Sequence, residues 1–182
     1  MISLNKQKGD TMKANILLIS LIMTQSSIAA RTCSTYIPDE WPDSRYTVAT
    51  ISSDNVITDN KSGLMWKQCS EGLSGNDCSK GIATTHTWKQ SLDLALSTEY
   101  ANFSDWRLPN IEELRSISAI NCLNPSINEI AFPNTPLDWF WSSTPFPNAT
   151  AVYMSRVIFF SQGGDSTGYR GSDGHVRLVR SN

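Results

Sequence analysis

The stretch that organises this sequence is Asp105-Trp106-Arg107-Leu108-Pro109-Asn110, which is followed at once by Ile111-Glu112-Glu113-Leu114-Arg115. Asn110 is a favourable helix N-cap residue, and Glu113, three positions later, can complete a capping box. Pro109 has no backbone N–H to donate, and it holds the residue before it in an extended conformation. The stretch therefore predicts that a strand or loop ends at Pro109 and that a helix begins directly after Asn110.

The predicted helix has one apolar face, because apolar residues recur at helical spacing at Ile111, Leu114, Ile117 and Ile120. We interpret the stretch before the helix as a structural junction, with its charged side chains paired or hydrogen-bonded nearby; a ligand-binding role is the alternative. The residues to which we assign structural roles are Trp66, Trp88, Asp105, Trp106, Arg107, Pro109 and Asn110.

The N-terminal segment has the composition of a secretory signal peptide. Three lysines precede an apolar run at residues 14–23, and small residues follow at Ser27 and Ala29. The apolar run is short for a membrane span, although an uncleaved anchor is the alternative. We expect a signal peptide at residues 1–29, an extended N-terminal lead at residues 30–54 and a single domain at residues 55–181.

The charge of the chain argues against nucleic acid as a partner. The full sequence has 15 basic and 17 acidic residues, and removal of the leader leaves 12 and 16, a net charge of about −4. The mature chain has no further run of apolar residues long enough to predict a transmembrane segment. We therefore expect an exported protein that is periplasmic, displayed at the cell surface or secreted.

All four cysteines follow the predicted leader, and an even number in an exported chain favours disulfide bonds. Cys69 and Cys78 flank a polar, glycine-containing loop that can close on itself. This pairing leaves Cys33 with Cys122, although the two other pairings are open from sequence alone. A zinc site is the alternative, but the chain has no C-x-x-C motif and only two histidines.

The rest of the chain alternates between strand and helix patterns. A first helix is predicted to open at Thr87-Trp88, with Gln90 as capping partner and an apolar face of Trp88, Leu92, Ala95 and Leu96. Strands are predicted at residues 46–51, 56–59, 64–66, 139–143, 151–161 and 174–180. Two early helices and several late strands indicate an α+β fold.

The ordered motifs of the chain resemble a known family. They are Thr58-Asp59, Gly63-Leu64-Met65-Trp66, Thr87-Trp88, Asp105-Trp106-Arg107-Leu108-Pro109-Asn110, Asn124-Pro125, Phe132-Pro133, Trp141-Ser142-Ser143 and Val176-Arg177-Leu178-Val179-Arg180. This series is similar to the C-terminal domain family of the Legionella collagen-like adhesin, over roughly residues 55–181. The Arg-Leu-Pro element and the closing strand are also similar to the C-type-lectin-like and formylglycine-generating-enzyme superfamily.

The resemblance implies a C-type-lectin-like α+β fold, with two helices packed on small antiparallel sheets and stabilised by disulfides. It also implies an adhesive role, since the named adhesin binds sulfated glycosaminoglycans. This chain has no collagen-like repeat, so a trimeric stalk is not implied. It also differs from that adhesin in being net acidic. The closing strand has no cysteines to match the copper-binding pair of the formylglycine enzymes.

Catalytic motifs are absent from the sequence. There is no G-x-S-x-G, H-E-x-x-H, P-loop or G-x-G-x-x-G pattern. Glu112 and Glu113 are adjacent, so they point in different directions on a helix, and their place in its first turn suits the helix dipole. His86 and His175 stand beside predicted element ends and are interpreted as surface or hydrogen-bonded residues. We expect no catalytic residues and no enzymatic activity.

Ligand binding is the function that the sequence favours. The candidate ligand-binding residues, which combine aromatic faces with cationic groups, are Trp139, Trp141, Tyr153, Arg156 and Arg170. The alternative is that the tryptophans belong to the core and the arginines are solvated or paired. No cofactor is expected, although oxygen ligands in the 163–166 and 172–174 loops make calcium conceivable. A glycan or an envelope or surface protein is the expected partner, and a structural subunit of a bacterial envelope assembly is the alternative function.

Overall fold

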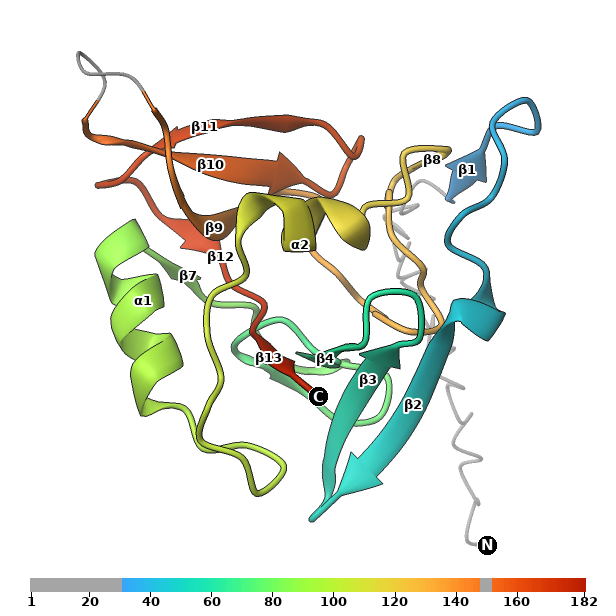
Figure 1. Ribbon diagram of the computed structural model, residues 1–182, viewed down its shortest axis with the longest axis horizontal. Coiled ribbons are helices and arrows are strands. Elements are labelled where there is room, and N and C mark those ends of the chain that lie inside the picture. Colours follow the sequence, from blue (N-terminus) through green and yellow to red (C-terminus); the bar gives the residue numbers. More distant parts are fainter. Residues whose placement is uncertain (1–30, 148–151) are drawn as a thin grey trace, which may run out of the picture.

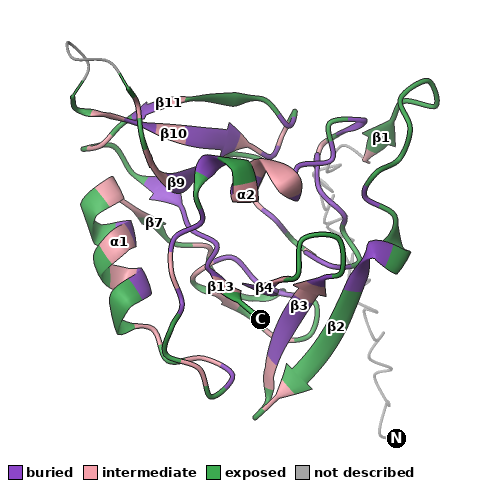
Figure 2. Ribbon diagram, in the orientation of Figure 1, coloured by how far each residue is buried: buried purple, intermediate pink, exposed green. Residues whose placement is uncertain are grey.

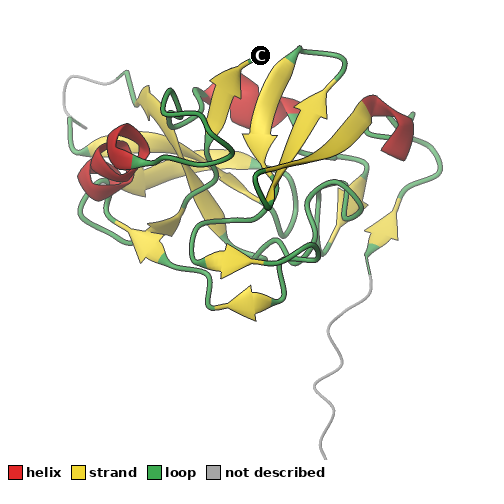
Figure 3. Ribbon diagram, turned by 90° about the horizontal axis from the view of Figure 1, so that it is seen from below, coloured by secondary structure: helices red, strands yellow, loops and turns green. Residues whose placement is uncertain are grey.

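The computed structural model describes residues 31–147 and 152–182 (Figure 1). The predicted signal peptide at residues 1–29 lies outside these described residues. Within them, most of the ordered chain is strand and loop, and the helices are few and short (Figure 3). The combination of small sheets with two α-helices confirms the predicted α+β class. Two disulfides stabilise this arrangement.

Two sheets form the centre of the molecule. The first is antiparallel, in the order β13-β4-β3-β2, and comprises β2 (Tyr46–Ile51), β3 (Asp54–Asp59), β4 (Leu64–Lys67) and β13 (Val179–Ser181). The second has the order β11-β10-β9-β12-β7 and comprises β7 (Thr85–His86), β9 (Trp139–Pro145), β10 (Met154–Phe159), β11 (Asp165–Tyr169) and β12 (Gly174–His175). Short strand pairs join β1 (Thr32–Cys33) to β8 (Cys122–Leu123) and β5 (Leu73–Ser74) to β6 (Lys80–Gly81).

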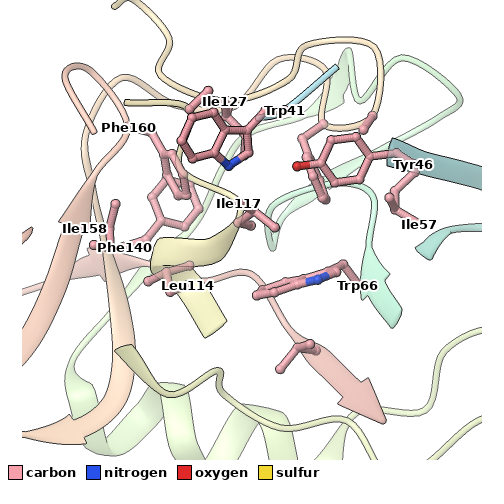
Figure 4. Close-up of a cluster of buried hydrophobic side chains, with 14 of the residues drawn as sticks. Trp41, Tyr46, Ile57, Trp66, Leu114, Ile117, Ile127, Phe140, Ile158 and Phe160 are labelled. Atoms are coloured by element: carbon pink, nitrogen blue, oxygen red, sulfur yellow. The ribbon is translucent and has the colours of Figure 1, made fainter. Parts of the chain in front are cut away.

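The central strands of both sheets bury side chains on both faces, since successive residues of a strand point to opposite sides. Along β9, Phe140 belongs to one apolar cluster and Trp141 to the other, and β4 divides Trp66 from Met65 in the same way. The first cluster gathers side chains from both sheets and from α2 (Ile111–Ser116), as Figure 4 shows. The second cluster lies under α1 (Trp88–Ser97).

Both helices begin where the sequence predicts. Thr87 caps α1 and Asn110 caps α2, and each forms a complete capping box with the residue three positions later. Two apolar positions differ from expectation. Leu96 is 82% exposed, because the face of α1 that packs on the second cluster ends at Ala95. Ile120 is also exposed, since α2 ends at Ser116 and the helical spacing no longer applies.

The disulfides pair Cys33 with Cys122 and Cys69 with Cys78, the pairing that the short polar loop favours. The Cys33–Cys122 bond joins β1 to β8, which fixes the N-terminal lead against the domain. The lead also contributes to the core, where Trp41 and Tyr46 are buried in the first cluster (Figure 4). The segment at residues 31–54 is therefore packed as part of the same folded unit.

The predicted closing strand at residues 174–180 is divided in two. β12 belongs to the five-stranded sheet and β13 to the four-stranded sheet, so residues 176–178 carry the chain from one sheet to the other. The carbonyls of Val176 and Leu178 accept hydrogen bonds from the backbone N–H groups of Glu71 and Lys67, each at 3.0 Å. This crossing segment therefore joins both sheets to the chain that begins the Cys69–Cys78 loop.

Arg177, in the middle of the crossing segment, is fully buried. Val176 and Leu178 point into the second cluster, so Arg177 points the opposite way, with its guanidinium carbon 4.9 Å from the ring centre of Phe132. From the sequence, Arg177 is named only as part of the closing strand, and its burial is not predicted. Burial lowers the pKa of the Arg177 guanidinium to about 9.

Neutral oxygens surround this guanidinium. Nη1 donates to the carbonyls of Lys67 and Gln68, and Nη2 donates to Ser70 Oγ at 3.1 Å and Thr135 Oγ1 at 2.8 Å. No carboxylate of the described residues forms a salt bridge with it. The side chain thus links the crossing segment to the start of the disulfide loop and to the turn after Phe132.

A second buried charge fixes the base of the β2–β3 hairpin. Asp59 accepts hydrogen bonds from Arg45 Nε at 2.7 Å and Nη2 at 2.6 Å, from Ser62 Oγ at 2.7 Å and from the Lys61 N–H at 3.0 Å. Burial alone would raise the pKa of Asp59, but the hydrogen bonds from Arg45, Ser62 and Lys61 together hold it below its ordinary value. The ionised pair therefore belongs to the native state.

We predict that Arg177→Met destabilises the domain by about 3–5 kcal/mol, because it leaves several buried acceptors without a donor. Urea unfolding of the oxidised protein measures this change. The matched control is Arg180→Met, which removes an arginine paired with the largely exposed Asp105 and should cost about 1 kcal/mol or less. Equal losses in the two variants would contradict the role assigned to Arg177.

We predict that Asp59→Asn costs about 3–5 kcal/mol at pH 7, because it leaves Arg45 buried without its carboxylate. The pKa of Asp59 is lower in the folded state, so its contribution is complete above the unfolded pKa of about 3.9 and is lost as the pH falls through the folded value. Unfolding free energies measured from pH 7 to pH 2 should thus fall less steeply in acid for the variant. Parallel pH profiles would contradict this.

Candidate functional site

The five-stranded sheet separates the candidate ligand-binding residues onto its two faces. In the β9–β10–β11 register, Trp141 lies opposite Val157 and Arg156 lies opposite Thr167. Trp139 and Trp141 pack with the cluster under α1, whereas Arg156 reaches the acidic and basic side chains beside α2. The residues that the sequence grouped therefore do not form one surface.

Trp141 belongs to the core, which corrects its assignment as a ligand-binding residue. It is fully buried, and its indole N–H donates to the His86 carbonyl at 2.8 Å. Trp139 is partly buried, with its ring centre 4.8 Å from that of Trp141. Gly168 lies against both rings, because a Cβ at this position would stand 2.0 Å from Trp139 Cζ3. Packing against the sheet accounts for both tryptophans.

Arg156 is committed to an ion cluster on the opposite face. The Asp165 carboxylate accepts from both Arg115 and Arg156, and Arg115 also pairs with Glu112. The hydrogen bond from Arg115 is the largest of the effects that lower the pKa of Asp165. Asp165 thus serves two arginines, and no group of three or more potential metal-binding side chains occurs in the part of the chain that the structure describes.

An exposed tyrosine pair stands where β10 begins and β11 ends. Tyr153 is 67% exposed and Tyr169 is 55% exposed, and their ring centres are 6.5 Å apart. The Arg170 N–H donates to the Tyr153 carbonyl at 2.7 Å, which holds the two segments together. The Tyr169 ring lies over Gly171, where a Cβ would stand 2.6 Å from Tyr169 Cε1. Local backbone contacts therefore hold this exposed pair in place.

Arg170 directly follows Tyr169 in the chain, and its side chain packs on α1. Its guanidinium carbon stands 4.2 Å from the ring centre of Trp88, and its Nε donates to Ser155 Oγ at 2.8 Å. Trp88 is itself fixed, since its indole N–H donates to the Ser142 carbonyl at 2.8 Å. We call Tyr153, Tyr169, Arg170 and Trp88 the tyrosine–arginine surface.

Sequence reasoning identified Tyr153 and Arg170 but missed Tyr169. The glycine pair at residues 163–164 was interpreted as punctuation after a strand, so the following strand, β11, was not predicted. The sequence signal that could have identified Tyr169 was its position next to Arg170, in a segment that follows a glycine turn and so can form a hairpin with the preceding strand. Only the pairing of β10 with β11, in which Met154 lies opposite Tyr169, brings the two tyrosines together.

The charged residues of the central junction have separate partners. Arg107 forms a two-point salt bridge with Glu113, with both N–O distances at 2.7 Å, and Asp105 pairs with Arg180. Burial would raise the pKa of Glu113, but the hydrogen bonds from Arg107 and from the Asn110 N–H hold it below its ordinary value. Glu113 therefore both completes the capping box of α2 and forms the salt bridge with Arg107.

An apolar groove lies between α1 and the junction. It encloses about 500 Å³ and is lined mainly by Leu92, Leu96, Trp106 and Leu108, with Arg107 and Asn110 at its polar side. Leu96, whose exposure differs from expectation, lies at this groove. The lining of this groove is largely apolar.

The two histidines occupy neighbouring strands. Gly174 lies opposite His86, and His175 lies opposite Thr85. His175 is buried, and burial lowers the pKa of its imidazole. The His86 ring is within 3.0 Å of Thr84 Oγ1. Neither histidine belongs to a cluster of acidic, cysteine or histidine side chains among residues 31–147 and 152–182.

Comparison with known proteins identifies the domain. Across the described residues, no helix combines the length and apolar character needed to cross a membrane. A search of curated proteins found no match. The model of the Lcl C-terminal domain family matches residues 55–180, which include both central sheets except β2, the first residue of β3 and the final residue of β13. With its capping boxes, junction and closing segment in the expected order, the chain belongs to the Lcl C-terminal domain family.

Proposed function

We propose that this protein is an exported, non-catalytic ligand-binding module of the adhesive type, and that it binds glycans through the tyrosine–arginine surface. The observation that carries the proposal is the exposed pair of Tyr153 and Tyr169, together with Arg170, the next residue after Tyr169, which stacks on Trp88. Large aromatic rings fixed at the surface offer apolar faces with a polar edge. A glycan that is acidic, through a carboxylate or a sulfate, supplies the complementary groups.

Arg170 accounts for the choice of an acidic glycan. A guanidinium presents several donors in a fixed plane, which suits two-point binding of a carboxylate or a sulfate. Stacking on Trp88 orients this plane, so little side-chain entropy remains to be lost on binding. The net acidity of the whole chain does not oppose this, because the local charge around a site determines which ions it attracts.

The family and the disulfides support export and adhesion. Membership of the Lcl C-terminal domain family suggests an adhesin-related role. Two disulfides with no free cysteine among the described residues are typical of proteins in oxidising compartments. A C-type-lectin-like relationship of the fold is part of the same proposal, and it agrees with two helices set against small, mostly antiparallel sheets.

We predict that the oxidised protein, expressed with its own leader, binds acidic glycans on an array. Tyr153→Ala and Tyr169→Ala should each weaken binding about tenfold, because loss of one stacking contact on an aromatic side chain costs about 1–3 kcal/mol. Arg170→Lys should also weaken binding, because it keeps the charge but loses the planar donors. The matched control is Tyr36→Ala, which removes an almost fully exposed tyrosine that follows β1 in the chain. Figure 1 shows β1 on the opposite side of the molecule from the start of β10.

The array is measured at low and physiological salt, with and without calcium. Binding that weakens with salt and ignores calcium supports recognition by Arg170. A blank array with protein that unfolds cooperatively would overturn the glycan proposal. Equal weakening by Tyr36→Ala would show that the tyrosine–arginine surface is not the site.

The alternative function is a structural or protein-interaction subunit of a bacterial envelope assembly. The apolar groove beside α1 favours it, because a fixed groove with an exposed leucine suits an apolar side chain of a partner protein. Such a subunit would co-purify with an envelope protein and would not bind glycans. Leu96→Asp should then abolish co-purification while leaving any glycan binding unchanged.

A further inference from the structure

The outer strand of the four-stranded sheet has an edge that no other described strand covers. β2 is the last strand in the order β13-β4-β3-β2, and the side chains of residues 47–50 are exposed on both of its faces. Figure 2 shows this contrast, with β2 mostly exposed beside a largely buried β3. Val48 is 48% exposed at the middle of the strand. The strand is thus held in the fold mainly by its ladder with β3.

The backbone of this edge has free hydrogen-bonding groups. The Asn60 N–H donates to the Arg45 carbonyl at 2.9 Å, so residues 45, 47, 49 and 51 face β3 in the alternating antiparallel pattern. Val48 and Thr50 therefore direct their N–H and carbonyl groups outward. The Tyr46 N–H already donates to the Asp43 carbonyl. No backbone partner for the outward groups of Val48 and Thr50 occurs among the described residues.

Two other sheet edges, those of β13 and β11, are protected. Arg107 exchanges two backbone hydrogen bonds with Val179, at 2.9 and 3.0 Å, and so covers the outer edge of β13. β11 carries Asp165, whose carboxylate is engaged by two arginines. β2 has none of the usual protective features: its sequence, Tyr-Thr-Val-Ala-Thr-Ile, contains no charge and no proline, and its register with β3 has no bulge.

We propose that β2 pairs with β2 of a second copy of this chain, antiparallel about a two-fold axis at Val48. In this register Val48 lies opposite its own copy and Tyr46 lies opposite Thr50, so outward backbone groups meet outward groups. About four hydrogen bonds form, two between the Val48 residues and two from Thr50 N–H to the Tyr46 carbonyl. The two four-stranded sheets become one continuous sheet across the axis.

The composition of the strand favours a copy of itself as partner. Two-fold pairing places each side chain opposite one from the same strand, and a charged strand would then bring like charges together. β2 avoids this cost because all six of its residues are uncharged. A dimer of this kind also presents two tyrosine–arginine surfaces and so binds a polymeric ligand bivalently; this consequence, unlike the pairing, depends on the proposed function.

The oligomeric state tests the pairing directly. Sedimentation of the oxidised protein, expressed with its own leader, should show a monomer–dimer equilibrium over a concentration series. Val48→Lys places two charges opposite each other at the axis and should weaken the dimer at least tenfold. The matched control is Ile82→Lys, which replaces an apolar side chain that is 83% exposed outside β2 and should leave the equilibrium unchanged. A monomer at every concentration would overturn the proposal.

Cross-linking tests the register. Two Cα atoms in a hydrogen-bonded antiparallel pair are about 5.5 Å apart, which suits a disulfide, so Val48→Cys should give a covalent dimer under mild oxidation. Ala49→Cys is the control on the same strand, because in this register the two Ala49 side chains are diagonal neighbours about 7–8 Å apart. Equal cross-linking of both variants, or none of Val48→Cys, would overturn the register. Neither the sedimentation result nor the cross-linking result depends on glycan binding. Failure of the dimer proposal can therefore be told apart from failure of the glycan proposal.

Discussion

The burial of Arg177 is the constraint on which much of the structure depends. Its guanidinium links three segments that are distant in sequence, namely residues 67–70, the turn at Thr135 and the crossing between β12 and β13. Neutral oxygens and the Phe132 ring surround it, so its charge is stabilised only while all of these segments are in place. The crossing from one sheet to the other can therefore form its native contacts only when the start of the Cys69–Cys78 loop is also in its native position.

This coupling explains where the surface features lie. The central strands of the two sheets are buried on both faces, so few side chains are available for binding except at strand ends and on the outer strands. The tyrosine–arginine surface occupies an end of β10 and β11, and the open edge of β2 is the outermost position of the other sheet. A rigid interior thus presents two separate exposed features, one suited to a ligand and one to a copy of the chain.

The parts of the fold that could be predicted depend on neighbouring residues. Both capping boxes follow from residues three positions apart, and the Cys69–Cys78 loop closes over a short polar segment. The parts that could not be predicted depend on residues far apart. Trp141 is buried because α1 and β10 both pack on it, and nothing beside it in the sequence distinguishes it from an exposed tryptophan. The strand β11 escaped prediction because its short polar residues resemble a loop.

By itself, the sequence determined the α+β class, the starts of both helices, the disulfide pairing that it favoured and the family, since local hydrogen bonding and the order of motifs decide these features. Only the tertiary structure decided which charges and rings are buried. Alternation along the closing segment predicts that Arg177 and Leu178 point in opposite directions, but only the second sheet and the 132–135 turn make both directions interior. A strand pattern specifies two faces, and the packing of other elements decides whether either face meets water.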